Sequence, residues 1–500
     1  MNLISYLAMA GMVGVSLGRT AAAQDAAAAP AAVTFYVDSE QGNDAGSGTS
    51  PAQAWQTLAR VNREPFAAGS HILLKAGGAY AGSLRPQGSG LPGRPNVVDR
   101  YGEGNKPCIR TAGGPENPEQ IGVLLDNQQH WEIRNLDISG GYRGVVLRLK
   151  DFGVARHLYL TGLDIHDVHG GSTGDDSGIL CSNSGPSTAF ADLLIEGCTI
   201  EHVDRNGILI TDWPGPPSDA HRNTAVVIRG NRLRDIGGDG IFILACSGAL
   251  IERNVLRYAH QRVGRNPGER ACAGIWPQRS EDTLIQFNEV SHTAVGGLTV
   301  WDSEAFDDDG SCTGTIFQYN YSHDNAGGFL LNCGGKGTIV RYNLSQDDAT
   351  ATFTFESDTA TDSLIYNNTI YTRPGLTVQL VRSTFGKPNN LLFRNNLFYI
   401  AGEAQYALGA ITNIVFDHNA FFGNHRNRPP DAQALSVDPQ LASPGSGKDG
   451  MDTLTGYHLQ PTSPCRGAGV VIPGNGGRDF WGQPLSDQAP PDLGAHQHGR

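Results

Sequence analysis

The sequence predicts an all-β protein whose main body is a parallel β-helix, a solenoid of stacked coils built from strands and turns. Three observations predict it: an asparagine recurs at one place in a repeated strand frame, no amphipathic helix separates the strands, and glycine is abundant. The chain has 500 residues, with 65 glycines and 8% aromatic residues. Because a solenoid extends its core along one axis, this length is compatible with a single long domain.

Eight hydrophobic segments share one frame, as in TLIQFN, TIFQYN and TIVRYN. Their aligned asparagines are Asn231, Asn254, Asn288, Asn320, Asn343, Asn368, Asn396 and Asn419, spaced 23 to 34 residues apart. This spacing is the length of one supersecondary repeat. In stacked coils the same turn residue recurs about every 4.8 Å. Asparagine there can adopt the left-handed turn conformation and hydrogen-bond its neighbour in a ladder. We therefore expect consecutive members to be neighbours in space.

The N-terminal residues 1–23 contain an apolar run that ends in three alanines before Gln24. This pattern is typical of an export signal cleaved near Ala23, and the run is too short and interrupted to span a membrane. Residues 24–32 are expected to be a linker. The sequence thus predicts a periplasmic or secreted protein.

The rest of the chain divides into two ends and a repetitive middle. Residues 33–69 contain a strand, a loop rich in Gly, Asp and Ser, and a short helical stretch, which together would cap the open end of the stack. Coils are expected over residues 70–424. Residues 425–500 lack the asparagine frame and are expected to lie against the last coils as a C-terminal cap or trailing segment.

Net charge and cysteine content narrow the range of functions that the protein can have. A net charge of −13 and a pI near 5.6 argue against nucleic-acid binding, which needs a basic surface. The eight cysteines suit an oxidising compartment and lack the CxxC spacing of zinc sites. Cys246 with Cys272, and Cys312 with Cys333, bracket loops and are candidate disulfides, although spacing does not decide the pairing. We expect a monomer.

One strand of each coil follows a glycine, as in GIFIL, GIWPQ and GFLLN. Strand side chains alternate between the two faces, so if the first and third residues after the glycine point inward, the second and fourth face outward. The outward residues predicted in this way are Phe242, Leu244, Trp276, Gln278, Thr299, Trp301, Leu330, Asn332, Thr354, Glu356 and Gln379, with Asp212, Arg279, Asp302 and Arg382 one residue beyond, at the turn.

Three stretches, FYVDSEQGNDAGSGTSP, NYSHDNAGGFLLNCG and the closing DFWGQP with PPDLGA, together resemble right-handed parallel β-helix proteins of the pectate-lyase-like (pectin-lyase-like) superfamily. The resemblance covers nearly the whole chain after the signal and implies a right-handed coil. That superfamily includes polysaccharide lyases, glycoside hydrolases, uronate epimerases and non-catalytic adhesins, so the resemblance implies carbohydrate as the ligand without fixing the reaction. The NTDG and GHG elements of polygalacturonases are absent.

The predicted outward face carries two tryptophans on adjacent coils, Trp276 and Trp301. A large exposed aromatic side chain normally has a reason: it can stack on the apolar face of a pyranose ring, or it can pack beneath the insertions beside it. The long insertions 260–272 and 302–312 flank these residues and would wall a groove. The remaining predicted substrate-binding residues are Gln278, Asn332, Arg382 and Asp212.

Hydrolysis of a glycosidic bond needs one carboxylic acid and one carboxylate. Asp302 and Glu356 lie near this face two coils apart, so their backbones should be roughly 9 to 10 Å apart. Their side chains then approach the separation of inverting enzymes, about 6.5 to 9.5 Å. The sequence therefore favours a glycoside hydrolase with Asp302 and Glu356 as the catalytic pair and no required cofactor.

Two alternatives remain open. In a calcium-assisted polysaccharide lyase, Glu304, Asp307 and Asp309 would hold Ca²⁺. Its catalytic cations and base would be Arg279, Lys336 and His323, near the same edge. A non-catalytic glycan-binding protein would use the same groove, but an adhesin more often repeats its outward residues along the stack. Here the polar and aromatic residues concentrate between Gly274 and Glu356, which favours a single site.

Overall fold

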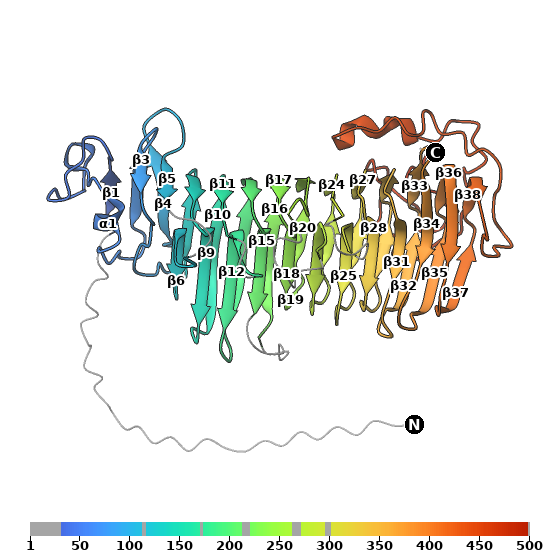
Figure 1. Ribbon diagram of the computed structural model, residues 1–500, viewed down its shortest axis with the longest axis horizontal. Coiled ribbons are helices and arrows are strands. Elements are labelled where there is room, and N and C mark those ends of the chain that lie inside the picture. Colours follow the sequence, from blue (N-terminus) through green and yellow to red (C-terminus); the bar gives the residue numbers. More distant parts are fainter. Residues whose placement is uncertain are drawn as a thin grey trace, which may run out of the picture.

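The computed structural model describes residues 32–112, 117–170, 174–212, 221–262, 272–295 and 302–498, and these residues form a long parallel β-helix (Figure 1). Every pairing between its named strands is parallel, and each joins one coil to the next. The expected export signal and most of the linker lie outside the described residues. No helix among the described residues is long and apolar enough to cross a membrane.

Each complete coil contributes strands to three faces. The first face is a 15-stranded sheet: β1 (Thr34–Val37), β2 (His71–Lys75), β4 (Asn96–Tyr101), β7 (Trp131–Arg134), β10 (Val154–Thr161), β13 (Ala189–Glu196), β16 (Asn223–Arg229), β19 (Cys246–Ser247), β20 (Leu250–Glu252), β23 (Leu284–Gln286), β26 (Ile316–Gln318), β29 (Ile339–Arg341), β32 (Thr361–Tyr366), β35 (Asn389–Arg394) and β37 (Thr412–Asp417).

The second face comprises β3 (Ala79–Ala81), β5 (Cys108–Thr111), β8 (Asp137–Gly140), β11 (Asp164–Val168), β14 (Thr199–Val203), β17 (Arg232–Ile236), β21 (Val255–Arg257), β24 (Glu289–Ser291), β27 (Tyr321–His323), β30 (Leu344–Gln346), β33 (Thr369–Thr372), β36 (Leu397–Ala407) and β38 (Ala420–His425).

The third face comprises β6 (Ile121–Asp126), β9 (Arg143–Lys150), β12 (Ser177–Ser184), β15 (Asn206–Asp212), β18 (Ile241–Leu244), β22 (Ile275–Gln278), β25 (Glu304–Asp309), β28 (Gly328–Cys333), β31 (Ala351–Phe355) and β34 (Thr377–Arg382). The long strand β36 pairs with both β33 and β34, which joins the second and third faces.

The interior is filled by columns of apolar side chains that repeat once per coil. On the third face Ile241, Ile275, Phe306, Leu330 and Phe353 are cross-strand partners in succession, and all five have no exposed surface. They belong to one core cluster that runs from Val37 to Phe421. A single continuous core confirms the expectation of one solenoid.

The predicted asparagine ladder is confirmed. The backbone N–H and Nδ2 of Asn254 both donate to Oδ1 of Asn288, at 3.0 Å each, and Asn288 donates in the same way to Asn320 at 2.9 and 3.1 Å. The same pattern joins each consecutive pair from Asn231 to Asn419, and all eight asparagines are fully buried. The ladder supplies partners to polar groups that water cannot reach.

We expected the asparagine to adopt the left-handed conformation at the turn. The residue before it does so instead. Arg253, Phe287 and Tyr319 have φ angles of 57°, 56° and 57°. This conformation costs roughly 1 to 2 kcal/mol per residue for an L-amino acid. The asparagine amide is committed to bonds along the stack, so the preceding residue makes the change of direction.

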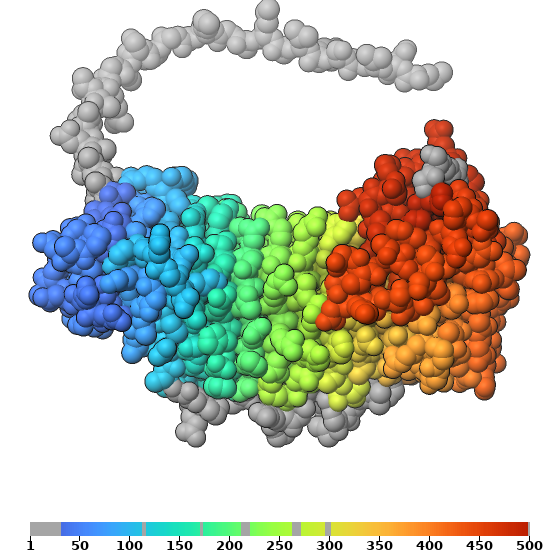
Figure 2. All heavy atoms as spheres, turned by 90° about the horizontal axis from the view of Figure 1, so that it is seen from above, coloured from blue at the N-terminus to red at the C-terminus, as the bar shows by residue number. Residues whose placement is uncertain are grey.

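The segments before and after the coils pack against them. At the N-terminal end a short 3₁₀ helix η1 (Pro51–Gln53) and α1 (Leu58–Val61) place Trp55 and Leu58 against the first coil, with Phe35 stacked on Trp55 at 4.8 Å. At the other end the segment 425–498, with the 3₁₀ helix η3 (Met451–Tyr457), folds back over the last coils (Figure 2). There the Tyr457 hydroxyl donates to Gln346 Oε1 at 2.6 Å.

The candidate disulfides are not formed. All eight cysteines lie among the described residues and carry free thiols. Cys246 is packed in the core on the first face, whereas Cys272 contacts Arg205 on the outer side of the third face. Likewise Cys333 lines an outer cavity while Cys312 is buried.

Replacing Asn288 with Ala is expected to lower the free energy of unfolding by about 2 kcal/mol or more. The change leaves two buried donors of Asn254 without their acceptor, and each buried orphan costs about 1 to 3 kcal/mol. Chemical denaturation measures the effect. Asn105→Ala, at an exposed loop position, is the matched control and should change stability little. Equal stability of the two variants would contradict a structural role for the ladder.

Candidate active site

The outer side of the third face carries a cavity of about 240 Å³, called the acid cavity below. It lies over β22, β25, β28, β31 and β34 and the residues that adjoin them. Its lining residues are Cys272, Ala273, Trp276, Asp302, Glu304, Asp307, Asp309, Leu331, Cys333, Thr354, Glu356, Arg382 and Phe385. Five of them are carboxylic acids, an unusual density for so small a space.

Strand alternation explains why β25 contributes several of these acids. Asp307 and Asp309 pair with Leu331 and Cys333, so all four side chains face the cavity, whereas Asp308 points inward and bonds the Thr338 hydroxyl. The five acids differ in accessibility. Asp302 and Asp309 are partly exposed, while Glu304, Asp307 and Glu356 are buried. A substrate can therefore reach Asp302 and Asp309 most directly.

Crowding and burial shift the protonation of this cluster. Burial, with a further contribution from the charge of Asp309, raises the pKa of Asp302 to about 7. Burial and the charge of Asp302 raise the pKa of Glu304 to about 8, and burial places the pKa of Asp307 well above its usual range. Carboxyl groups this close cannot all ionise together. The cluster therefore retains protons at neutral pH.

Asp309 is held by hydrogen bonds. Gln278 Nε2 donates to its Oδ2 at 2.7 Å, and the backbone N–H of Gly310 donates to its Oδ1 at 2.6 Å. Burial still raises its pKa, although these hydrogen bonds oppose the shift. The side chain is thus fixed in orientation while it remains partly open to solvent.

Glu356 accepts more hydrogen bonds than Asp309 does. Its two oxygens accept hydrogen bonds from the backbone N–H of Thr384 at 2.9 and 3.1 Å, the Thr384 hydroxyl at 2.7 Å and the backbone N–H of Phe385 at 2.8 Å. These contacts fix the segment after β34, which carries Phe385 to the cavity. Phe385 is 55% exposed. Sequence analysis missed this residue, although an aromatic side chain in the turn STFGKP was a usable signal.

Arg382 supplies positive charge to the acid cavity. It was expected at the turn but lies on the outward side of β34, opposite Thr354. Its Nη2 is 3.9 Å from Glu304 Oε1, and the side chain is almost fully buried. A guanidinium at this distance partly offsets the negative charge of the acids.

Trp276 forms the N-terminal side of the acid cavity. Its indole stacks on Phe242 with ring centroids 3.7 Å apart and an interplanar angle of 4°. Its Nε1 donates to Asp239 Oδ1 at 2.9 Å. The indole is therefore fixed by an aromatic neighbour and by a buried carboxylate, which suits a rigid platform for a sugar ring.

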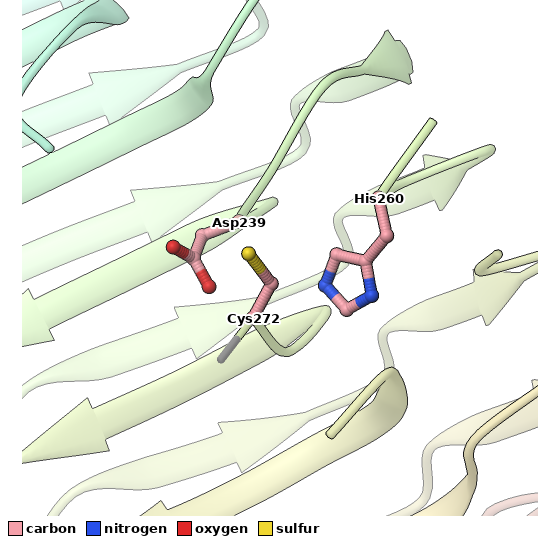
Figure 3. A group of neighbouring side chains, drawn as sticks. All are labelled: Asp239, His260 and Cys272. Atoms are coloured by element: carbon pink, nitrogen blue, oxygen red, sulfur yellow. The ribbon is translucent and has the colours of Figure 1, made fainter. Parts of the chain in front are cut away.

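Asp239 belongs to a buried group with His260 and Cys272, whose potential ligand atoms lie within 4.8 Å of one another (Figure 3). The donor types are those of a metal site. However, Arg205 Nη1 donates to Asp239 Oδ2 at 3.1 Å and to Cys272 Sγ at 3.0 Å. Two of the three donors already bind a cationic guanidinium, so the group fits a charge-balanced support for Trp276 better than a metal centre.

The residues expected to hold calcium, Glu304, Asp307 and Asp309, do line the acid cavity. Among the described residues, two groups of His, Cys or Asp side chains bring three potential metal ligands within 4.8 Å of one another. They are Asp239 with His260 and Cys272, and His292 with His323 and Asp449. The calcium trio is not one of them.

Several other expected site residues lie elsewhere. Arg279 and Lys336 occupy exposed positions and do not line the cavity. His323 is buried on the second face, with Nδ1 3.0 Å from Asp324 Oδ2. Trp301 lies outside the described residues, and Asp212 ends β15 with a side chain outside them.

The expected outward position of Asn332 is wrong. Its side chain points inward, where Nδ2 donates to the Thr338 hydroxyl at 2.9 Å. Leu330, also expected outward, pairs with the core residue Phe306, and Leu331 takes the outward place. The cause is the position of Gly328. Ile275 pairs with Phe306, which puts Gly274 beside Ala305, whereas Gly328 pairs with Glu304, so a count that starts at Gly328 is one residue early. A Cβ there would meet the carbonyl oxygen of Ala351, so the position requires glycine.

The coils define a class by fold: a right-handed parallel β-helix protein, with the acid cavity on its third face. A family model described as a right-handed β-helix region matches residues 121–276. The particular relatives are glycosidases. Lacto-N-biosidase of Bifidobacterium longum subsp. longum is 26% identical over 92% of this chain and 36% of its own length. Alpha-1,3-galactosidase A of Akkermansia muciniphila is 27% identical over 27% of this chain and 24% of its own.

The chain thus spans little more than a third of the length of the lacto-N-biosidase it matches. Among solved structures, the GH136 lacto-N-biosidase from Eubacterium ramulus has a TM-score of 0.59 and 21% identity, covering 81% of this chain and 68% of that one. The complex of XylC with xylose has a TM-score of 0.57 and 11% identity, covering 93% and 98%. These two likenesses establish the fold.

Replacing Glu304 with Gln is expected to stabilise the protein at pH 8 by more than about 1 kcal/mol and to have little effect at pH 5. The pKa of Glu304 is raised from 4.5 to about 8 in the folded chain. The unfolded chain therefore releases this proton first, and the free energy of unfolding falls as pH rises from 4.5 to 8. Gln removes that dependence.

Denaturation curves for both proteins across this pH range measure the effect. Glu103→Gln, at an exposed position, is the control. A wild-type stability that is flat across the range, or a variant that follows the wild-type slope, would contradict a buried protonated Glu304.

Proposed function

We propose that the protein is a glycoside hydrolase that cleaves a glycosidic bond of an oligosaccharide or polysaccharide in the acid cavity. The observation that carries this proposal is the pairing of two partly exposed acids, Asp302 and Asp309, beside the stacked Trp276. Hydrolysis needs a proton donor and a second carboxyl group flanking the bond. The cavity supplies both next to a surface on which a sugar ring can stack.

Asp302 is the general acid in this proposal. With a pKa of about 7 it keeps its proton near neutral pH and can transfer it to the leaving oxygen. Asp309 is the second carboxylate, and acts on the anomeric carbon directly or through a water molecule. The bonds from Gln278 and Gly310 orient it for either role. The anomeric form of the released sugar distinguishes the two.

This assignment changes the partner of Asp302 from Glu356 to Asp309. The four hydrogen bonds donated by Thr384 and Phe385 occupy both oxygens of Glu356, which leaves it poorly placed to attack carbon or accept a proton. Glu356 is a positioning residue that sets the segment bearing Phe385. Arg382 balances the charge of the acids, and Trp276 is the sugar platform.

The relatives suggest which substrate to test first. The names of two similar proteins, from Bifidobacterium longum and Eubacterium ramulus, specify lacto-N-biosides, so we propose a β-linked lacto-N-bioside as the first candidate. The lyase alternative has less support, because Arg279, Lys336 and His323 do not line the acid cavity. In the proposed reaction the carboxyl groups of the chain act without a metal ion.

Asp302→Asn and Asp309→Asn are each expected to lower kcat by at least about 10²-fold, the contribution typical of acid–base groups. Glu356→Gln should cost less, because it disturbs only the placement of Thr384 and Phe385. Turnover of a panel of neutral and uronic-acid glycans without an activated leaving group measures these effects. Asp362→Asn, on the exposed first face, is the control.

Product analysis separates the reaction classes. Hydrolysis predicts new reducing ends without the ultraviolet absorbance of an unsaturated product, and activity that survives a chelator. Unsaturated products together with loss of activity in EDTA would contradict the assignment and favour calcium-assisted elimination. Binding of a glycan without any cleavage would favour the non-catalytic alternative.

The pH dependence of turnover tests the role of Asp302. Because the acid must be protonated and its pKa is about 7, kcat/KM is expected to fall as pH rises above about 7. Substrates with a p-nitrophenyl leaving group need little protonation and should show a weaker decline than unactivated glycans. The same alkaline decline for both types of substrate would count against Asp302 as the proton donor.

A further inference from the structure

A second cavity, of about 480 Å³, lies on the same outer side of the third face, over the preceding coils. It is larger than the acid cavity, and the proposed chemistry does not use it. Its lining residues are Arg148, Lys150, Gly174, Asp175, Ser182, Asn183, Ser184, Leu209, Thr211 and Phe242. These residues belong mainly to β9, β12, β15 and β18, whereas the acid cavity begins at β22.

The two cavities meet at the stacked aromatic pair. Phe242 lines the second cavity and Trp276 lines the acid cavity, and the two residues are direct cross-strand partners. Their rings are nearly parallel, with centroids 3.7 Å apart. The Trp276 face turned away from Phe242 is on the side of the acid cavity, and a sugar chain that passes over the edges of the two stacked rings reaches from one cavity to the other.

Leu209 and Phe242 form the apolar floor of the second cavity, and the row of outward apolar residues continues beyond it. Leu209 pairs with Phe242, and Leu180 and Val146 follow in the same outward row. These side chains form a cluster separate from the interior core. The next outward row, two residues along each strand, holds Ser182 and Thr211. An apolar floor beside hydroxyl groups is the composition expected of a sugar-binding site.

The charge of the second cavity also differs from that of the acid cavity. Arg148 pairs with Asp126 at 2.7 Å and with Glu119 at 3.4 Å, and Asp175 pairs with Arg143 at 3.1 Å. The Lys150 ammonium has no acidic partner among the described residues. The ammonium is thus available to donate hydrogen bonds to a ligand.

We propose that the second cavity is a remote glycan-binding subsite that holds the part of an oligosaccharide chain several residues away from the cleaved bond. This inference rests on the proposed function of the acid cavity. From β12 to β25 the third face advances four strand spacings, roughly 19 Å. A ligand that fills both sites is therefore longer than a disaccharide, and the protein prefers extended glycans over short glycosides.

The test compares short and long substrates in variants of the second cavity. Ser182→Trp fills the cavity, and Lys150→Gln removes its cation without filling it. For a hexasaccharide that carries the cleaved linkage, Ser182→Trp should lower kcat/KM by about tenfold or more, the loss expected when a contact worth about 1.4 kcal/mol disappears. For p-nitrophenyl β-lacto-N-bioside, kcat/KM should remain at the wild-type value.

Matched controls exclude a general defect. Thr199→Trp places the same bulk on the outer side of the second face, and Lys448→Gln removes an exposed charge in the C-terminal segment. Neither should alter the ratio between long and short substrates. If Ser182→Trp unfolds, Lys150→Gln still tests the proposal, with a loss of about threefold or more expected for the hexasaccharide alone. Equal effects on both substrates, or none, would overturn it.

Calorimetric binding to Asp302→Asn protein separates this inference from the proposed function. One outcome would refute the hydrolase and support the subsite. In it, the wild-type protein cleaves nothing, but the Asp302→Asn protein binds a hexasaccharide about tenfold more tightly than the corresponding disaccharide. Ser182→Trp must then abolish this difference in affinity. Cleavage without any length preference would refute the subsite alone. Absence of binding to every glycan in the panel would overturn both.

Discussion

The rest of the structure depends on in-register parallel pairing of successive coils, which the buried asparagine ladder fixes. From Asn254 to Asn396, the side-chain oxygen of each asparagine accepts two hydrogen bonds from the coil before it, and its backbone N–H and Nδ2 each donate one to the coil after it. A slip of one residue in the register would leave these buried groups without hydrogen-bond partners and would turn every core side chain outward. The ladder therefore converts a pattern in the sequence into a fixed spatial column, and the same register sets every column on the outer faces.

The acid cavity is a consequence of that register. Three coils supply the buried acids and Arg382, which therefore lie within a few strand spacings of one another. The strands hold the acids in place despite the repulsion between them. The fold tolerates this because the remaining length of the stack supplies a continuous core. Raised pKa values at Asp302, Glu304 and Asp307 are the electrostatic result, and such groups gather at functional sites.

Sequence predicted the features that repeat and missed those that occur once. The asparagine column and the cavity positions of Trp276 and Glu356 follow from periodicity. The inward direction of Asn332 follows from the register of β28, in which Gly328 pairs with Glu304 and not with the position that matches Gly274, and the sequence alone does not reveal this offset. Glu356 was recognised as a carboxylate near the site, but its hydrogen bonds depend on the local path of Thr384 and Phe385 after β34, which the repeated frame does not specify.

A crystal structure of the Asp302→Asn variant with a bound oligosaccharide tests the central claim most directly. We expect a sugar ring stacked against Trp276 and the glycosidic oxygen within hydrogen-bonding distance of the side chain at position 302, with Asp309 near the anomeric carbon. A sugar chain bound on another face, or a glycosidic bond placed nearer to Glu356 than to Asp309, would contradict the account.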